Sequence, residues 1–212
     1  MKKEKEEKAD KSSALWKAVK KDRLDIMLDI ETLGIQEKSV VLSLCAKSFT
    51  LSGNTPPSSF CLHRHISVLS SLWHRLKVDE GTLEWWRQQS QESKDAALAG
   101  QQEAVSVDEA MSDLYDLFNY YSGLYDIYIW GRGIGSFDLP LLDSIMSDCI
   151  ESYERPWKYW QVVDVRSVVN FCRQCGLKDE RSPTPHDAKD DVEKQIREVQ
   201  LCYQYVKVER AI

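Results

Sequence analysis

The sequence predicts a mixed α/β domain in which helices pack on a single sheet of five strands. Three aliphatic segments that follow one another near the N-terminus alternate as strands do, and two shorter strand-like segments further along each precede a helical pattern. With 212 residues, of which 42% are hydrophobic, one such domain can bury its core without disulfide bonds.

The first three strands are expected to form an antiparallel meander at one side of the sheet. Residues 24–31 (LDIMLDIE) alternate and are rich in aliphatic side chains, and residues 39–51 and 59–67 also read as strands. The Gly- and Pro-containing segment 53–57 marks the turn between the second and third strands. Short connections of this kind favour antiparallel neighbours.

Two helices are predicted next. Residues 82–99 form the first, with Thr82 as its N-cap, and residues 106–121 form the second. Ser106 followed by Glu109 has the spacing of a capping box, and apolar residues recur behind it at the helical period.

The C-terminal half alternates between short strands and helices. Pro140 is tolerated in the first turn of a helix, and Gly176 is a typical helix end. The expected elements are strands over 126–131 and 162–165, helices over 137–150, 166–176 and 186–206, and a loop over 178–185.

The charge is divided unevenly along the chain. The formal net charge is −6, from 28 basic and 34 acidic residues. Residues 1–23 carry nine basic and five acidic side chains, a net of +4, which leaves −10 for the rest. We therefore expect residues 1–22 to be a basic, flexible tail and residues 23–212 to form the folded domain. An acidic body argues against binding nucleic acid through a broad basic face.

Membrane and secreted classes are disfavoured. No apolar run approaches the roughly 18–20 residues that span a bilayer. The N-terminal lysines are not followed by the apolar segment of a secretory signal. Six cysteines are too sparse for a disulfide scaffold in a chain of this length, so we expect a reducing, cytoplasmic location and no membrane partner.

Two carboxylates end the first predicted strand. Asp29 and Glu31 are two residues apart, so their side chains point to the same face of the sheet. Two acidic groups on one face of an apolar strand repel each other and are costly to bury unless a cation compensates them. The alternative is a frayed strand end at which both carboxylates lie in water.

Three further polar residues lie at the starts of predicted helices. Asp138 follows a strand and a glycine-containing turn over 131–135, which lets the backbone approach the sheet edge closely. His186 precedes Asp191 by five residues, and the ordinary pKa of histidine, about 6.5, suits a general base. Taken singly, Asp138 could be a plain charge at a helix N-terminus and His186 a surface residue.

The order of these motifs resembles that of a known superfamily. D-x-E on the first strand, F-D after a central strand and H-x-x-x-x-D at the last helix resemble the DEDDh 3′–5′ exonucleases, which have an RNase H-like fold. Leu44–Ala46, Thr82–Trp86 and Asp164–Ser167 narrow the resemblance to the phage and bacterial RNase T-like exonucleases and exoribonucleases, over residues 24–206. One departure is Lys189, which stands where that superfamily usually has an apolar residue.

The resemblance implies a metal-dependent 3′–5′ exonuclease. Such an enzyme hydrolyses phosphodiester bonds from the 3′ end of single-stranded DNA or RNA, or of 3′ overhangs, and releases 5′-mononucleotides by a two-metal mechanism. The resemblance also implies a homodimer. His186 would be the general base, and two Mg²⁺ or Mn²⁺ ions would be held by four carboxylates, Asp29, Glu31, Asp138 and Asp191.

Residues near these motifs are the expected substrate contacts. In similar enzymes the stretch after the first motif meets the terminal nucleotide, and tandem tryptophans offer sequence-tolerant stacking for bases. For each tryptophan the alternative is a packing role, in the core for one and at its rim for the other. The expected contacts are Thr32, Leu33, Gly34, Trp85, Trp86, Ser136 and Phe137.

Two hypotheses from other classes stay open. A non-catalytic RNase H-like nucleic-acid-binding module would share the fold, but such modules usually lose one or more carboxylates. A zinc-stabilised binding protein could use Cys172 and Cys175, which form a C-x-x-C pair, or Cys61, His63 and His65, which alternate on one strand. The choice between DNA and RNA depends on pocket details that the sequence does not expose.

Overall fold

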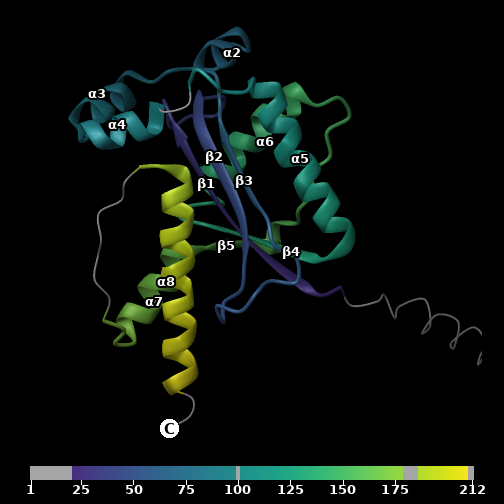
Figure 1. The fold of residues 1–212 in the computed structure, drawn as a ribbon, viewed down its shortest axis with the longest axis vertical. Helices are drawn as coiled ribbons and strands as arrows, with labels where there is room; N and C mark the ends of the chain where they lie inside the picture. Colours follow the sequence, from purple (N-terminus) through teal and green to yellow (C-terminus); the bar gives the residue numbers. More distant parts are fainter. Residues whose placement is uncertain (1–20, 99–100, 179–185, 210–212) are drawn as a thin grey trace, which may run out of the picture.

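The sheet predicted from the sequence is present in the computed structural model, which describes residues 21–98, 101–178 and 186–209. It contains five strands: β1 (Arg23–Thr32), β2 (Val41–Phe49), β3 (Cys61–His65), β4 (Asp126–Gly131) and β5 (Val162–Asp164). Their order is β3-β2-β1-β4-β5 (Figure 1). β1, β2 and β3 are antiparallel, whereas β4 and β5 run parallel to β1. The mixed sheet and its N-terminal meander are therefore confirmed.

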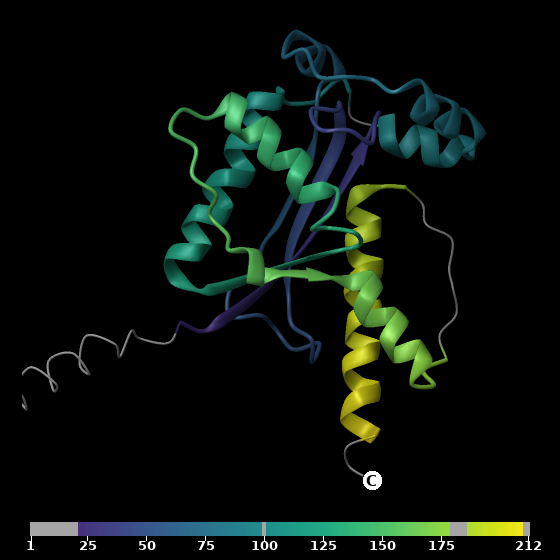
Figure 2. The same cartoon turned by 180° about the vertical axis from the view of Figure 1, so that it is seen from behind.

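Helices cover both faces of this sheet. α5 and α6 lie on one side, α7 and α8 lie on the other, and α2, α3 and α4 lie beyond the end at which β1 finishes (Figures 1 and 2). A short 3₁₀ helix, η1, precedes β5. The bounds are α2 (Val68–Trp73), α3 (Glu80–Gln88), α4 (Gln91–Leu98), α5 (Val107–Leu124), α6 (Asp138–Cys149), η1 (Tyr159–Gln161), α7 (Val165–Gln174) and α8 (Ala188–Glu209).

The alternation along β1 divides the core into two parts. Ile26, Leu28 and Ile30 belong to the larger core, which β1 shares with α5 and α6. Met27 belongs to the smaller core, which lies under α7 and α8. Because strand side chains alternate, the carboxylates at positions 29 and 31 share the face of Met27 and point toward α8.

The structure corrects the region between β3 and α5. The single helix predicted over 82–99 is two helices, α3 and α4, because Ser90 accepts a hydrogen bond from the Ser93 N–H (3.1 Å) and starts a second helix. The predicted N-cap, Thr82, was wrong: the carboxylate of Asp79 caps α3 and accepts from the Thr82 N–H (2.8 Å). The helix α2 was not predicted.

Two predicted helix ends are confirmed. Ser106 accepts from the N–H of Glu109 (3.1 Å) and caps α5. Gly176 follows Cys175, the C-cap of α7, and has φ 109°, a left-handed conformation that favours glycine. The predicted tail, apart from residues 21 and 22, and most of the loop over 178–185 lie outside the described residues. None of the helices in the described part of the chain is both long and apolar enough to cross a membrane.

One glycine brings β4 very close to β1. A Cβ added at Gly131 would lie 2.6 Å from the carbonyl oxygen of Leu28 and 2.9 Å from Cδ1 of Ile134. Both distances are shorter than real Cβ contacts, so any side chain here would push the ends of the two strands apart.

We predict that Gly131→Ala lowers the free energy of unfolding by about 1–3 kcal/mol because the added methyl group meets backbone. Gly123→Ala is the matched control, because Gly123 lies exposed near the end of α5 with nothing within 4 Å of an added Cβ. That change should leave stability unchanged or raise it by up to about 1 kcal/mol. Urea unfolding followed by circular dichroism measures both, and equal stability of the two variants would contradict the close approach at Gly131.

Candidate active site

The carboxylates of β1 point at the first turns of α8. β1 is the central strand of the sheet, and Asp29 and Glu31 lie in its C-terminal half. Glu31 is only 8% exposed. The side-chain amide of Gln195 donates a hydrogen bond to Asp29 Oδ1 (2.7 Å), which fixes one carboxylate against the helix. The frayed strand end considered above is therefore wrong for this pair.

Asp138 lies near the same carboxyl end of the sheet as Asp29 and Glu31, just after β4. β4 runs parallel to β1, with Trp130 opposite Met27, so both strands end on the same side. The glycine-containing turn then leads directly into α6, which begins at Asp138, and this side chain is 5% exposed. Gly133 adopts φ 78° in the turn, and its N–H donates to the Asp164 carboxylate (2.7 Å).

The start of α8 supplies His186 and Asp191. Asp187 caps this helix, because its carboxylate accepts from the N–H groups of Lys189 and Asp190 (both 3.0 Å). His186, with φ 56°, is therefore the last residue before the helix, and Asp191 lies one turn inside it. The side chain of Lys189, the departure from the superfamily pattern, is exposed.

All five residues predicted to be catalytic line one cavity of about 190 Å³. Ligand atoms of Glu31, His186 and Asp191 lie within 4.8 Å of one another. The structure therefore brings together motifs that are widely separated in the sequence. The complete lining is Asp29, Ile30, Glu31, Arg132, Phe137, Asp138, His186, Asp191, Lys194 and Gln195.

Burial raises the pKa values of the four carboxylates, and repulsion by other acidic groups nearby adds to the rise. Burial is the largest cause at each of them. The pKa of Asp29 lies well above its ordinary value, with the charges of Asp138, Glu31 and Asp191 adding to the effect of burial. The pKa of Glu31 rises to about 8, that of Asp138 to about 7 and that of Asp191 to about 6. A cluster of this kind calls for a positive counter-charge.

Three polar residues of the cavity were not predicted from the sequence. Gln195 donates a hydrogen bond to Asp29. The charge of Lys194 partly offsets the rise in the pKa of Asp191, and it adds to the effect of burial in lowering the pKa of His186. Arg132 forms an ion pair with Glu198 beside the cavity. Lys194 and Gln195 follow Asp191 by three and four positions, so helical periodicity alone would have placed them on the same face.

The donor atoms of the cavity fit divalent metal ions. Asp191 Oδ1 is buried and has no hydrogen-bond partner among the described residues. Such an atom is costly in a folded protein unless it has a ligand. Carboxylate oxygens are the donors that Mg²⁺ and Mn²⁺ prefer, and a cation would compensate the charge of these buried groups. The cavity thus contains a candidate ligand set for divalent ions.

A second cavity of about 460 Å³ adjoins the first and shares Ile30, Glu31 and Phe137 with it. It lies between the end of β1 and α3. Among the expected substrate contacts, four line this second cavity: Thr32, Trp85, Trp86 and Phe137.

The other expected contacts lie elsewhere. Leu33 packs against the core, and Gly34 is pressed against Ser39, whose Oγ would lie 2.5 Å from an added Cβ. Ser136 is exposed and donates to the Gly133 carbonyl within its own turn (2.9 Å). These three residues lie in the segments next to the cavities, but they line neither cavity.

The tandem tryptophans have different roles. Trp86 is 7% exposed, packs with Leu42 and Ala97, and donates its indole N–H to the Thr32 carbonyl (2.9 Å). Trp85 is 41% exposed at the cavity wall, and its ring centroid lies 4.8 Å from that of His186. Trp86 thus fastens α3 to the end of β1, whereas Trp85 is free to meet a ligand.

An open five-stranded sheet in this order, with carboxylates from β1, α6 and α8 meeting at one edge, defines the RNase H-like exonuclease class. The sequence supports a narrower statement, because residues 24–203 match the family described as 3′-5′ exoribonuclease Rv2179c-like domain. The chain belongs to that family. The resemblance drawn from the motifs is therefore confirmed at the level of superfamily and subgroup.

Individual relatives agree with this assignment. The chain is 26% identical over 162 residues to an exodeoxyribonuclease of Enterobacteria phage T4, covering 68% of this chain and 70% of the phage protein. Its fold is similar to E. coli exonuclease I in complex with a dT13 oligonucleotide, with a TM-score of 0.62, 14% identity and coverage of 85% of this chain. A zinc-bound exonuclease I–ssDNA complex gives a TM-score of 0.60 at 14% identity over 85% of this chain. The chain spans only 41% and 40% of those two chains.

The cysteine and histidine residues considered for structural zinc do not assemble into a site. Within residues 21–98, 101–178 and 186–209, two groups of three potential ligands have donor atoms within 4.8 Å of one another. One is Glu31, His186 and Asp191 in the cavity. The other consists of His74, Asp108 and Cys149, and neither group includes Cys61, His63, His65, Cys172 or Cys175.

The raised carboxyl pKa values predict a pH dependence of stability in the metal-free protein. The pKa of Glu31 is about 4.3 in an unfolded chain, and burial raises it to about 8 in the folded one. Between these values the folded state binds more protons, so the free energy of unfolding falls as the pH rises from about 5 to about 8.

Glu31→Gln removes one contribution to this fall. We expect the variant to exceed the wild type in stability by at least about 1 kcal/mol near pH 8 with a chelator present, and to converge with it near about pH 4. Urea unfolding across this pH range is the measurement, with the exposed Glu154→Gln as control. A wild-type stability that rises steadily from pH 5 to pH 8 without metal would contradict the burial of these carboxylates.

Proposed function

We propose that this chain is a metal-dependent exonuclease that removes 5′-mononucleotides from the 3′ ends of single strands. The observation that carries the proposal is the meeting of four carboxylates and one histidine in a single cavity. A binding module has no use for such a cluster, because its repulsion and desolvation destabilise the fold without improving phosphate binding. The non-catalytic alternative is disfavoured on that ground.

The four carboxylates are the proposed metal ligands. Asp29, Glu31 and Asp191 would hold one Mg²⁺ or Mn²⁺, and Asp138 together with Asp29 would hold a second. When bound, the ions supply charge neutralisation at the phosphate and activation of the attacking water. Gln195 orients Asp29 through its hydrogen bond, and the core packing of β1 against α8 keeps the ligand set in place.

His186 is the proposed general base. Burial and the nearby charge of Lys194 lower its pKa, so the imidazole is neutral and able to accept a proton near pH 7. Its ring lies edge-on to Trp85, with the two ring planes at 83°. This contact helps to position the imidazole of His186, whose backbone lies outside α8. A base stacked on Trp85 would lie beside that imidazole.

The second cavity is the proposed site for the terminal nucleotide. Its volume falls within the usual range of small-ligand pockets, about 300–1,000 Å³, and it shares the Glu31 wall with the metal site. Trp85 offers an exposed aromatic face to a base, which is a sequence-tolerant way to hold a single strand. The exposed side chain of Ile35 forms part of the rim.

Both single-stranded DNA and RNA are proposed substrates. The matching family is described as exoribonuclease, whereas the phage T4 relative is named an exodeoxyribonuclease. Stacking on Trp85 suits either polymer, since every base has an aromatic face. A homodimer and a cytoplasmic location stay predictions from the sequence.

Asp29→Asn tests the proposed site. We expect the rate of oligonucleotide shortening to fall at least about 100-fold, because the residue shared by both proposed ions loses its charge. The substrates are matched 5′-labelled DNA and RNA strands, with Mg²⁺ or Mn²⁺, resolved as ladders on a gel. Asp116→Asn, an exposed change on α5, is the control and should retain full activity. Full activity of the Asp29 variant, or shortening of strands whose 3′ end is blocked, would sink the proposal.

His186→Ala separates proton transfer from metal binding. Removing a general base typically lowers the rate about 10²–10⁴-fold, and we expect a loss in that range. Metal uptake measured by calorimetry should remain, because the four carboxylates are untouched. If this variant no longer takes up metal, then His186 is a ligand rather than the base.

A further inference from the structure

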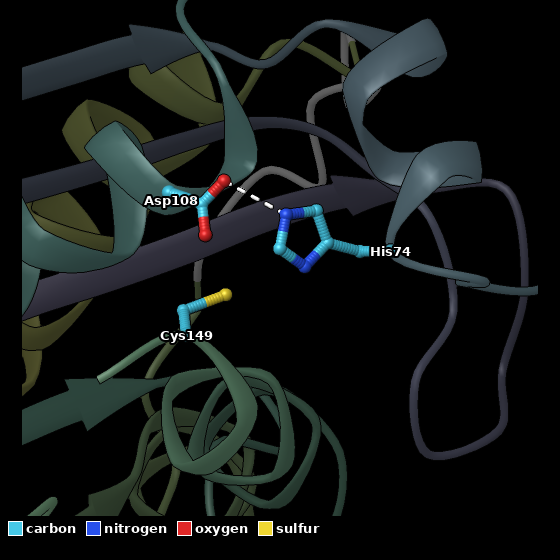
Figure 3. A group of neighbouring side chains, drawn as sticks. All are labelled: His74, Asp108 and Cys149. Carbon is cyan, nitrogen blue, oxygen red and sulfur yellow. Dashed lines mark hydrogen bonds and ion pairs between the residues drawn. The ribbon is translucent and has the colours of Figure 1, made fainter. Parts of the chain in front are cut away.

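A second group of potential metal ligands lies far from the exonuclease cavity. It consists of His74, Asp108 and Cys149, whose donor atoms all lie within 4.8 Å of one another. The three side chains converge from three separate elements, with the sulfur of Cys149 directed toward the space beside the carboxylate and the imidazole (Figure 3). Cys149 ends the helix that Asp138 begins, so at 1.5 Å per residue the two sites are about 16 Å apart along α6.

Hydrogen bonds hold two of the three ligands next to each other in the metal-free structure. His74 directly follows α2, and Asp108 lies in the first turn of α5. These two elements are joined, because the hydroxyl of Ser70 in α2 accepts from the N–H of Val107 (2.9 Å). His74 Nε2 and Asp108 Oδ2 are 2.8 Å apart.

The third ligand is placed by the end of α6. The Ile150 N–H bonds back to the Met146 carbonyl (2.9 Å) and closes the last turn around Cys149. The neighbouring Asp148 pairs with Lys38 (2.6 Å) in the connection between β1 and β2. The thiol therefore lies at a helix end that is fixed on both sides.

We propose that His74, Asp108 and Cys149 bind one Zn²⁺ ion. A nitrogen, an oxygen and a sulfur donor form a set that zinc accepts, whereas Mg²⁺ and Ca²⁺ disfavour thiolate. The cavity of the exonuclease site has oxygen donors and an imidazole but no thiol, so a sulfur-to-metal signal reports the second site alone. The zinc site does not depend on the proposed nuclease function.

The observed spacing is close to what zinc requires. Bonds of about 2.0–2.1 Å in a tetrahedron place nitrogen and oxygen donors about 3.3 Å apart, and a sulfur slightly further. The 2.8 Å pair need open by only a small amount to admit the ion. The ion replaces the thiol proton, which leaves to the solvent, and the Nε2 proton that His74 shares with Asp108, in exchange for which Nδ1 takes up a proton so that the imidazole stays neutral. Water occupies the fourth position, since the side chains of His74 and Asp108 are 32% and 50% exposed.

A zinc ion at this site would fix the start of the segment that leads to α3 and Trp85. From His74 the chain runs through Lys77, whose N–H and carbonyl bond to Lys38 and Val40, to Asp79, the N-cap of α3. The ion would clamp α2 to α5 and α6 and so anchor this segment to the body of the domain. Its expected effect is on stability rather than on chemistry.

Cobalt serves as the test probe because it replaces zinc and reports thiolate ligation by its spectrum. The reduced, metal-free full chain is titrated with Co²⁺ and then with Zn²⁺. We expect a sulfur-to-cobalt charge-transfer band whose full intensity corresponds to one thiolate-bound ion per chain and which Zn²⁺ abolishes. We also expect a rise of the unfolding temperature with Zn²⁺. Cys149→Ser should lose the band and show a smaller rise than the wild type, because the carboxylate cavity still takes up Zn²⁺, whereas Cys61→Ser and Cys175→Ser, at exposed cysteines, should keep the band and the full rise.

A second variant guards against misfolding of the first. Asp108→Ala changes a half-exposed side chain, and we expect it to weaken Co²⁺ binding at least about 10-fold while retaining the circular dichroism of the wild type. Absence of the charge-transfer band in the wild type at excess Co²⁺ would overturn the proposal, and so would a band of full intensity in folded Cys149→Ser. After either result, His74, Asp108 and Cys149 would be a hydrogen-bonded cluster at a helix junction without a metal-binding role.

Discussion

Electrostatic repulsion among four buried carboxylates is the constraint on which the rest of this structure depends. Asp29, Glu31, Asp138 and Asp191 come from a strand and two helices, and each is raised in pKa chiefly by burial. Repulsion and desolvation both disfavour bringing these side chains together, so the packing of the rest of the fold must hold them there. Two cores, one on each face of the sheet, provide the compensating stability. The folded domain is acidic, which argues against a basic binding face, and four of its acidic side chains lie together in this cavity.

The parts of the site that lie on periodic elements could be predicted from the sequence. The alternation of β1 fixed the shared face of Asp29 and Glu31, and the sharp turn before α6 placed Asp138 at the strand ends. His186 and Asp191 were found through their spacing at the start of α8. The five strands and the N-terminal meander followed from the same local patterns, because strand and helix periods are properties of short segments.

Features that arise only from tertiary packing could not be predicted. The helix α2 carries exposed apolar side chains at Leu69, Leu72 and Trp73, so its pattern does not indicate a core-facing helix. The break between α3 and α4 contains neither glycine nor proline and depends on the Ser90 hydroxyl. The group of His74, Asp108 and Cys149 has no sequence signal, since each ligand lies in a different element and no motif spacing joins them.

The capping of α8 limits how the chain can change in length. The Asp191 N–H bonds to the Asp187 carbonyl (2.9 Å), so these two residues span the first turn of the helix. One residue inserted between them would rotate Asp191 by about 100° around the helix axis and remove it from the cavity. An insertion in the turn at 51–59, between β2 and β3, would displace no residue of either cavity. Related chains should therefore vary in length at the hairpin but keep the five-residue spacing from His186 to Asp191.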